Sequence, residues 1–277
     1  MSMQNHLIAR RHLFSTAHFY AQKRFSEAEN RANFGACFTP HGHGHNYVIE
    51  AFVSGGLDPQ TGLVMNVTDL DIHMKKVCAP FDHHHVNFDV PEFADAIPTT
   101  ENLASYLFNE LKQELSKHSP ELKLHHIRLY ETDDLWAEAS DKATKPTKGA
   151  SVTRQVEIRS IHHLENKAFS EKRNKAIYGI CYGTHGHHYK VQVTCVGQID
   201  EKTGLAVQRD ELDAVLKKKI VDPYDGVDLN KKFPNTSCEA LAKEFFELLR
   251  PELGNRLIKI GIQETRKNYF EFPAAGE

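Results

Sequence analysis

The sequence has little that would place the protein in a membrane or in an oxidising compartment. It contains no run of about 18 apolar residues, the minimum for a membrane-spanning helix. Its N-terminal residues, MSMQNHLIARRHLF, lack the apolar core of a signal peptide. The 5 cysteines are an odd and sparse set, which does not indicate a disulfide framework. We therefore expect a cytoplasmic protein with free thiols and no membrane partner.

Charge of one sign is also scarce. The formal net charge is −3, from 34 Lys and Arg against 37 Asp and Glu. A surface that binds nucleic acid needs a basic excess, so we expect no nucleic-acid partner. The length of 277 residues and the hydrophobic content of 40% suit two domains better than one.

Histidine, in contrast, is abundant, and it is clustered in the same way twice. Residues 37–47 read CFTPHGHGHNY and residues 181–189 read CYGTHGHHY. The sequence around the clusters repeats as well, since DPQTGLV at 58–64 corresponds to DEKTGLA at 200–206. A repeat of this length indicates two copies of a whole domain. We expect a first module at residues 1–138, a polar linker at 139–153 and a second, diverged module at 154–277.

Both copies show the same order of expected elements. Alternating or β-rich patterns predict strands at 7–15, 47–53, 63–67 and 124–132, and again at 189–196, 205–207 and 257–265. Helical patterns predict helices at 69–79, after a cap at Thr99 or Thr100, at 211–219 and at 238–249. This order predicts an α+β fold in which each module has a mainly antiparallel sheet and two helices. Because such thin modules leave sheet edges unpaired, we expect a homo-oligomer.

Each histidine cluster has the spacing of a metal site. Two histidines separated by one residue of a strand point to the same face of the sheet. A third ligand is expected at the end of the preceding strand, in FSTAH or SIHH. The candidate ligands are His18, His43 and His45 in the first copy and His163, His185 and His187 in the second, with His41 as an additional histidine. Three neutral imidazoles suit Zn²⁺ and leave a fourth position open. The alternative is a hydrogen-bonded or solvent-facing histidine cluster.

Six segments taken together are specific to one family. FSTAH, HGHNY, DPQTGLVMNVTDL, FDHHHVN, PTTENLA and LYETDD resemble, in that order, the 6-pyruvoyl-tetrahydropterin synthase family, which includes the 6-carboxytetrahydropterin synthases. The resemblance covers nearly all of residues 7–138 and, more loosely, residues 154–272. It implies a tunnelling fold, in which such modules assemble as trimers into barrels, here a trimer of tandem chains or larger. It also implies a zinc-dependent lyase of queuosine or tetrahydrobiopterin biosynthesis. Its substrate would be 7,8-dihydroneopterin triphosphate, converted to 6-pyruvoyl-tetrahydropterin or 6-carboxytetrahydropterin with loss of triphosphate.

The resemblance implies roles for individual residues. The zinc ligands fall on the histidines named above. Cys37 matches the general base of the family, and Asp82 and His83 match the Asp–His pair that works with it. Glu131 matches the carboxylate that grips the amino and ring N–H groups of the pterin. Without the resemblance, Cys37 reads as an inert cysteine and Glu131 as an ordinary surface carboxylate.

The remaining substrate-binding candidates come in corresponding pairs. They are Thr99 and Thr100 at the start of a helix in the first copy, which become Ser237 and Cys238 in the second, and Glu264 in the position of Glu131. The second copy also keeps Cys181 and Asp225 as possible catalytic residues.

One loop sets the second copy apart. It reads YDGVDLN where the first copy reads FDHHHVN, so that Gly226 stands in the place of His83. Family active sites combine the zinc and cysteine of one module with the Asp–His pair of another. Two pairings therefore stay open. Cys181 works with Asp82 and His83, or each copy pairs with its own kind.

Other classes of function are less well supported. A zinc- and pterin-binding protein with a non-catalytic second module is the main alternative, because Gly226 removes the proton-transfer imidazole from that copy. A zinc deaminase is disfavoured because the chain has no Cys-x-x-Cys motif.

Overall fold

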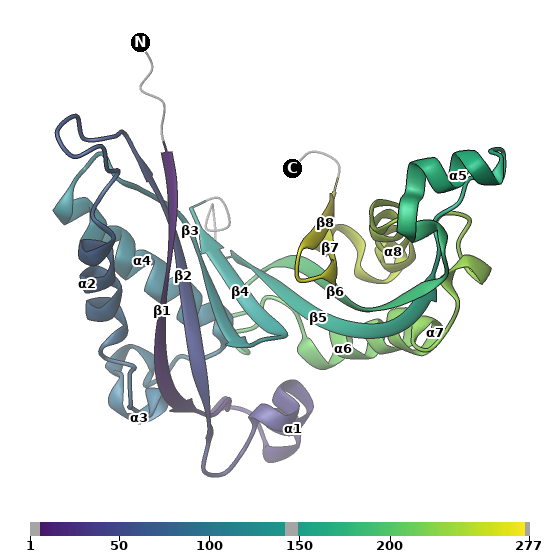
Figure 1. The fold of residues 1–277 in the computed structure, drawn as a ribbon. Helices are drawn as coiled ribbons and strands as arrows, with labels where there is room; N and C mark the ends of the chain where they lie inside the picture. Colours follow the sequence, from purple (N-terminus) through teal and green to yellow (C-terminus); the bar gives the residue numbers. More distant parts are fainter. Residues whose placement is uncertain (1–5, 142–148, 275–277) are drawn as a thin grey trace. The chain divides into compact units, whose positions relative to one another are not determined.

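The structure is a computed structural model that describes residues 6–141 and 149–274 (Figure 1). It divides into two compact units. The first contains the chain up to Val152 together with Val196–Asp210, and the second contains Thr153–Cys195 together with the chain from Glu211 onward. Residues 196–210 come from the second copy of the repeat but belong to the first unit. The module boundaries expected from the sequence assign these residues to the second module instead.

The first unit is built on an antiparallel sheet in the order β1-β2-β3-β4. Its elements are β1 (His6–His18), α1 (Glu27–Phe34), β2 (His43–Gly55), α2 (Val67–Cys78), α3 (Val86–Asp89), α4 (Thr100–His118), β3 (Lys123–Thr132) and β4 (Leu135–Ser140). Helices α2 and α4 pack against the strands (Figure 1).

Strand alternation decides which residues enter the core of this unit. On β2 the residues Tyr47, Ile49, Ala51 and Val53 are all 0% exposed. Side chains two residues apart share a face, so the same face continues towards the start of β2, where the histidine cluster lies. The candidate site therefore lies at the end of a packed core, on strands that cannot easily shift.

The second unit repeats this plan with the order β5-β6-β7-β8. The corresponding elements are β5 (Gly149–His162), α5 (Glu171–Tyr178), β6 (His185–Gln198), α6 (Arg209–Leu216), α7 (Asp222–Tyr224), α8 (Cys238–Leu253), β7 (Leu257–Thr265) and β8 (Asn268–Pro273). On β6 the buried residues Tyr189, Val191, Val193 and Cys195 take the places of the four core residues of β2.

The expected fold class is confirmed, since both units are α+β with antiparallel sheets. The first repeat has two long helices, α2 and α4, and the second has the shorter α6 and the long α8. The strands predicted at 63–67 and 205–207 are wrong. In the first copy the chain turns at Asp58, whose carboxylate accepts hydrogen bonds from the N–H groups of Gln60 (3.0 Å) and Thr61 (2.8 Å). Asn66 then caps α2 by accepting from the N–H of Thr68 at 3.0 Å. Capping and turn chemistry thus take up the residues that resembled a strand.

The fold also contains elements that the sequence did not predict, among them the helices α1, α3, α5 and α7 and the strands β4 and β8. Because β4 extends to Ser140 and β5 begins at Gly149, both strands enter the stretch expected to be a linker. Residues 142–148 of that stretch lie outside the described residues. None of the described helices is long and apolar enough to span a membrane.

Candidate functional site

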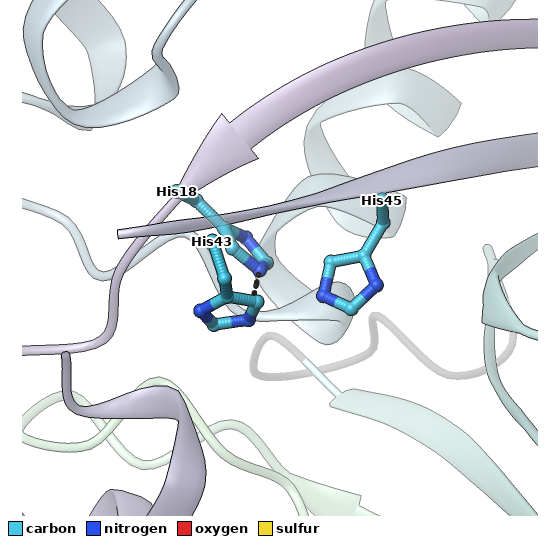
Figure 2. Close-up of side chains that lie close together, drawn as sticks. All are labelled: His18, His43 and His45. Carbon is cyan, nitrogen blue, oxygen red and sulfur yellow. Dashed lines mark hydrogen bonds between the residues drawn. The ribbon is translucent and has the colours of Figure 1, made fainter. Parts of the chain in front are cut away.

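Three histidines converge at the end of the first unit's core (Figure 2). Strands β1 and β2 pair so that His18 lies opposite His43, and His45 follows two residues further along β2. The Nε2 atoms of His18 and His43 are 3.2 Å apart. One ring nitrogen from each of the three lies within 4.8 Å of the others. His41 is exposed and does not belong to this group.

The surroundings of these rings keep them neutral and orient them. The Nδ1 atom of His18 lies 3.1 Å from the carbonyl oxygen of Pro98, so Nδ1 donates and the lone pair of Nε2 faces the other rings. Burial lowers the pKa of His18 to about 3, and it also lowers the pKa of His43 and His45. The buried Nε2 of His45 has no hydrogen-bond partner among the described residues. Neutral imidazoles with unused nitrogens are what a metal ion requires, so this cluster fits one.

The second unit has a matching cluster of His162, His185 and His187. The Nε2 atoms of His162 and His185 are 3.1 Å apart, and Nδ1 of His162 lies 3.0 Å from the carbonyl oxygen of Thr236. The Nε2 atom of His187 is buried and, within the described part of the chain, has no hydrogen-bond partner. This cluster fits a metal ion for the same reasons as the first.

The third histidine of this cluster is His162 and not His163, which the sequence analysis selected. The backbone N–H of Ser15 donates to Asp82 at 2.9 Å, and that of Arg159 donates to Asp225 at 2.8 Å. Ser15 therefore corresponds to Arg159, and three residues further along each strand come His18 and His162. His163 follows on the opposite face of the chain, where its Nε2 lies 3.6 Å from a carboxylate oxygen of Glu165.

Beside the first cluster lies a buried carboxylate, Glu131, on β3. One of its oxygens is 3.7 Å from Nε2 of His45. It accepts hydrogen bonds from the hydroxyls of Tyr20 (at 3.0 Å) and of Thr100. Burial raises the pKa of the Glu131 carboxyl, but Arg209, His18 and the Thr100 hydroxyl together hold it below its usual range. Glu131 is therefore an ionised acceptor inside the site.

Arg209, which was not among the residues expected from the sequence, forms an ion pair with Glu131 at 3.1 Å. It is the residue that starts α6, and it belongs to the segment that the second copy contributes to the first unit. The repeat carries a signal that would have found it. In the alignment of DPQTGLVMNV (58–67) with DEKTGLAVQR (200–209), Arg209 stands where the first copy has Val67.

Cys37 is a further neighbour of Arg209. Its carbonyl accepts the N–H of Tyr20 at 3.0 Å, and its side chain packs with Tyr20 and Phe34. Burial raises the pKa of the Cys37 thiol, and the neighbouring Arg209 opposes that rise. Cys181 holds the equivalent position in the second unit, where its carbonyl accepts the N–H of Leu164 at 2.7 Å. Leu164 thus replaces Tyr20, and the second copy lacks that hydroxyl.

Asp82 and His83 form the expected pair, with Nδ1 of His83 2.9 Å from the Asp82 carboxylate. The hydrogen bond from the N–H of Ser15 is the main cause that lowers the pKa of Asp82. Among the described residues, no hydrogen bond or ion pair joins this pair to Cys37. The imidazole of His83 is 81% exposed.

The backbone at His83 is unusual. Its φ of 62° is the only positive φ of a non-glycine residue in the described chain. Gly226 has a φ of 73° at the equivalent position, where its N–H donates to the carbonyl of Arg159 as that of His83 donates to Ser15. Glycine adopts this conformation without strain, whereas histidine does so at a cost in stability, so the imidazole of the first copy indicates a function.

Around the second carboxylate, Glu264, the partners are fewer. One of its oxygens lies 3.4 Å from Nε2 of His187 and 3.6 Å from that of His162, and the other accepts from the side chain of Asn268 at 3.1 Å. Cys238, in the position of Thr100, is another neighbour. Asp225 forms a bidentate ion pair with Arg159, which lowers the pKa of Asp225 to about 2.

Thr99 has a structural role in this arrangement. It caps α4 by accepting from the N–H of Asn102 at 3.2 Å, and its hydroxyl donates to the carbonyl of Gly204 at 2.6 Å. Thr99 therefore holds residues 196–210 in place, while Thr100 contacts Glu131 directly.

One protein family matches both halves of this chain. The family described as 6-pyruvoyl tetrahydropterin synthase matches residues 7–142 and again residues 151–275. The 6-pyruvoyl tetrahydrobiopterin synthase of Pongo abelii is 43% identical over 128 residues, which cover 46% of this chain and 86% of the relative. That of Homo sapiens is 42% identical over the same lengths and shares. A protein of Archaeoglobus fulgidus named as a putative 6-carboxy-5,6,7,8-tetrahydropterin synthase is 34% identical over 96 residues, covering 35% of this chain and 73% of the relative.

Among solved structures, the 6-pyruvoyl tetrahydropterin synthase of Caenorhabditis elegans aligns with a TM-score of 0.44 and 35% identity, covering 47% of this chain and 91% of that one. The family match extends over most of both halves. The chain therefore belongs, in both of its repeated halves, to the 6-pyruvoyl tetrahydropterin synthase family of enzymes.

Proposed function

We propose that this protein is a zinc-dependent lyase that converts 7,8-dihydroneopterin triphosphate to 6-pyruvoyl-tetrahydropterin with loss of triphosphate. The observation that carries the proposal is the same in each unit. A glutamate lies next to a histidine cluster, at 3.7 Å for Glu131 with His45 and at 3.4 Å for Glu264 with His187. The relatives named for a pyruvoyl product resemble the chain more than the relative named for a carboxy product, which favours the pyruvoyl branch.

Three neutral imidazoles with an open fourth position favour zinc over metals that prefer oxygen ligands. When bound there, Zn²⁺ supplies a Lewis acid that makes a hydroxyl group and the neighbouring C–H bond of the substrate more acidic.

The glutamate would hold the pterin ring. The amino group and the ring N–H of a pterin are two parallel donors, and a carboxylate offers two acceptors in matching geometry. Loss of that acceptor would leave buried donors without partners, so the glutamate provides specificity as well as affinity.

The cysteine and histidine would move the protons. A cysteine thiolate takes the carbon-bound proton, and the electron pair left on the substrate expels triphosphate as its C–O bond breaks. Asp82 accepts the Nδ1 proton of His83 at 2.9 Å, so Nε2 is the atom of His83 that exchanges a proton with the substrate.

We further propose that His83 and Asp82 act on the site of Cys181 rather than on that of Cys37. Residues 196–210 of the second copy belong to the first unit, where Arg209 pairs with Glu131, so we propose that a second copy completes the site of Cys37. That copy carries Gly226 and has no imidazole to offer. By the same arrangement a first copy, with its exposed His83, completes the site of Cys181.

We also propose that the protein works as a homo-oligomer. Strand β1 pairs with β2 on one side only, and it exposes Leu7 (60%) and Leu13 (66%). An unpaired edge with apolar side chains is commonly covered by another chain.

The proposed reaction is tested by its product. Zinc-loaded protein is incubated with 7,8-dihydroneopterin triphosphate and the pterins are identified by mass spectrometry, with chelator-treated protein as the control. We expect 6-pyruvoyl-tetrahydropterin and free triphosphate from the loaded protein only. Formation of 6-carboxytetrahydropterin would correct the branch, and unchanged substrate with folded, zinc-loaded protein would refute the lyase.

A further inference from the structure

Arg209 occupies the carboxylate that the proposed reaction assigns to the pterin. Its Nη1 atom donates to Oε1 of Glu131 at 3.1 Å, and its Nη2 atom lies 3.4 Å from Oε2. Two N–H groups of one guanidinium thus face two oxygens of one carboxylate, which is the fork geometry of a strong ion pair. Both acceptor atoms of Glu131 are engaged.

Other contacts of Arg209 use further polar groups around Glu131. Nη2 donates to the hydroxyls of Thr100 at 2.9 Å and Tyr20 at 3.1 Å, and it lies 3.4 Å from the buried carboxylate of Glu101. The side chain of Arg209 is only 15% exposed. The guanidinium is therefore largely buried among these polar groups and is not a surface residue.

The segment that carries Arg209 is itself held firmly in the first unit. The N–H of Ala206 donates to Glu101 at 3.2 Å, and the carbonyl of Gly204 accepts from Thr99 at 2.6 Å. Leu205 is buried in a small apolar cluster with Tyr20 and Phe34. Arg209 is thus positioned by a chain of packed contacts that starts several residues before it.

We infer that Arg209 is an internal competitor that closes the carboxylate anchor of the first copy to the guanidine-like edge of a pterin. This inference rests on the proposed function. A guanidinium and the amino–pyrimidinone edge of a pterin present the same pair of parallel N–H donors, so they compete for the same two oxygens of Glu131. Pterins then bind at Glu264, where no arginine or lysine pairs with the carboxylate within the described part of the chain.

The repeat shows that this closure is specific to one copy. Val67 takes the place of Arg209 in the first copy and has no donor to offer. A segment like that of residues 58–67, facing Glu264, would leave that carboxylate open. The two sites of one chain thus differ in ligand access and not only in the histidine of the partner loop.

The test measures pterin binding at one anchor at a time. The probe is neopterin, an oxidised and fluorescent pterin with the same ring edge, titrated against variants in a Glu264→Gln background so that only Glu131 can anchor it. Arg209→Val introduces the residue of the first copy, and Arg209→Lys keeps the charge but not the fork. Arg10→Val, which removes an exposed ion pair with Asp71, is the matched control.

We expect Arg209→Val to raise the affinity for neopterin by about tenfold or more, with a smaller gain for Arg209→Lys and none for Arg10→Val. Methylguanidinium should compete with neopterin in the Arg209→Val protein, and adding Glu131→Gln should abolish the gain. Thermal melting confirms which variants are folded. If Arg209→Val does not fold, because it leaves two buried carboxylates unpaired, Arg209→Lys decides.

Equal or weaker neopterin binding by the folded variants would overturn the inference. If the Glu264→Gln protein with Arg209 intact already binds neopterin at Glu131 as tightly as the Arg209→Val variant does, only this inference fails and the proposed function stands. If no variant binds neopterin and the wild-type chain makes no pterin product, the proposed function fails with it.

Discussion

Glu131 and Glu264 hold the same position in the two copies, but their surroundings are opposite. Glu131 is covered by Arg209 and by the hydroxyls of Tyr20 and Thr100. At Glu264 the corresponding hydroxyls are absent, because Leu164 and Cys238 replace them, and its neighbours are Asn268 and two histidines. After a duplication, each site can lose or gain a side chain that contacts its carboxylate, because the segment that completes the site can change. We therefore propose that the copies have divided their roles.

The largest expected effect separates the two cysteines. Cys181→Ala should lower the rate of pterin formation by roughly 10²–10⁴-fold, the usual contribution of a general base. Cys37→Ala should leave the rate near that of the wild type, because its anchor is occupied by Arg209. Initial rates of product formation, at equal zinc content, measure both. The reverse order of effects would show that the first copy is the active one and that the copies pair with their own kind.

The metal clusters can be compared by zinc content. We expect two zinc ions per wild-type chain, and one per chain in His162→Ala and in His18→Ala, since each variant removes one ligand of one cluster. The matched control is His163→Ala, which should retain both ions because its ring lies near Glu165. Elemental analysis of dialysed protein gives the ratio. Loss of an ion in His163→Ala but not in His162→Ala would restore the ligand expected from the sequence.

The two loops that carry His83 and Gly226 should respond in opposite directions when these two residues are exchanged. Gly226→His places a β-carbon at a φ of 73° and should lower the free energy of unfolding by about 1 kcal/mol or slightly more. His83→Gly relieves the same strain, so it should be neutral or stabilising while it abolishes most activity. Urea unfolding and initial rates measure the two effects. A destabilised His83→Gly protein would mean that the imidazole is structural.

The smallest effect concerns acid stability. Glu114 on α4 is paired with Lys76 (2.6 Å) and Lys117 (2.7 Å), and the hydrogen bonds with these lysines lower its pKa from 4.5 to about 2. Its counterpart on α8, Glu252, pairs with Lys219 at 2.8 Å, which also lowers the pKa of Glu252.

A carboxyl with a lowered pKa stabilises the fold above its unfolded pKa and loses that contribution as the pH falls through its folded pKa. The stability difference between wild type and Glu114→Gln should thus be constant above about pH 4.5 and disappear towards about pH 2. Glu252→Gln should show a smaller difference over the same window. Unfolding by urea at several pH values measures both, and a difference that grows as the pH falls would contradict the assignment.

Local rules were sufficient for the parts of the site that lie on one strand. Alternation placed His43 and His45 on one face, and the repeat led to their partners His185 and His187. Alternation could not decide between His162 and His163, because the adjacent histidines in SIHH lie on opposite faces. The register is set by the hydrogen bond from the N–H of Arg159 to Asp225.

Long-range contacts were beyond the sequence for a different reason. Arg209 follows a stretch that resembles a strand, and nothing near it in the chain reveals that this stretch folds beside Glu131. The same stretch was mistaken for a strand because its apolar residues, such as Leu205, are buried in a loop rather than in a sheet. Comparing the copies position by position would have exposed Arg209 opposite Val67, since a buried cation in place of an apolar residue needs an acidic partner.

The central claim is that one chain carries one open and one closed pterin anchor. The most direct measurement is the number of neopterin molecules bound per chain, by equilibrium dialysis, in the wild type and in Arg209→Val. The account predicts one tight site in the wild type, removed by Glu264→Gln, and two sites in Arg209→Val. Two equivalent sites in the wild type, or a single site removed by Glu131→Gln, would contradict it.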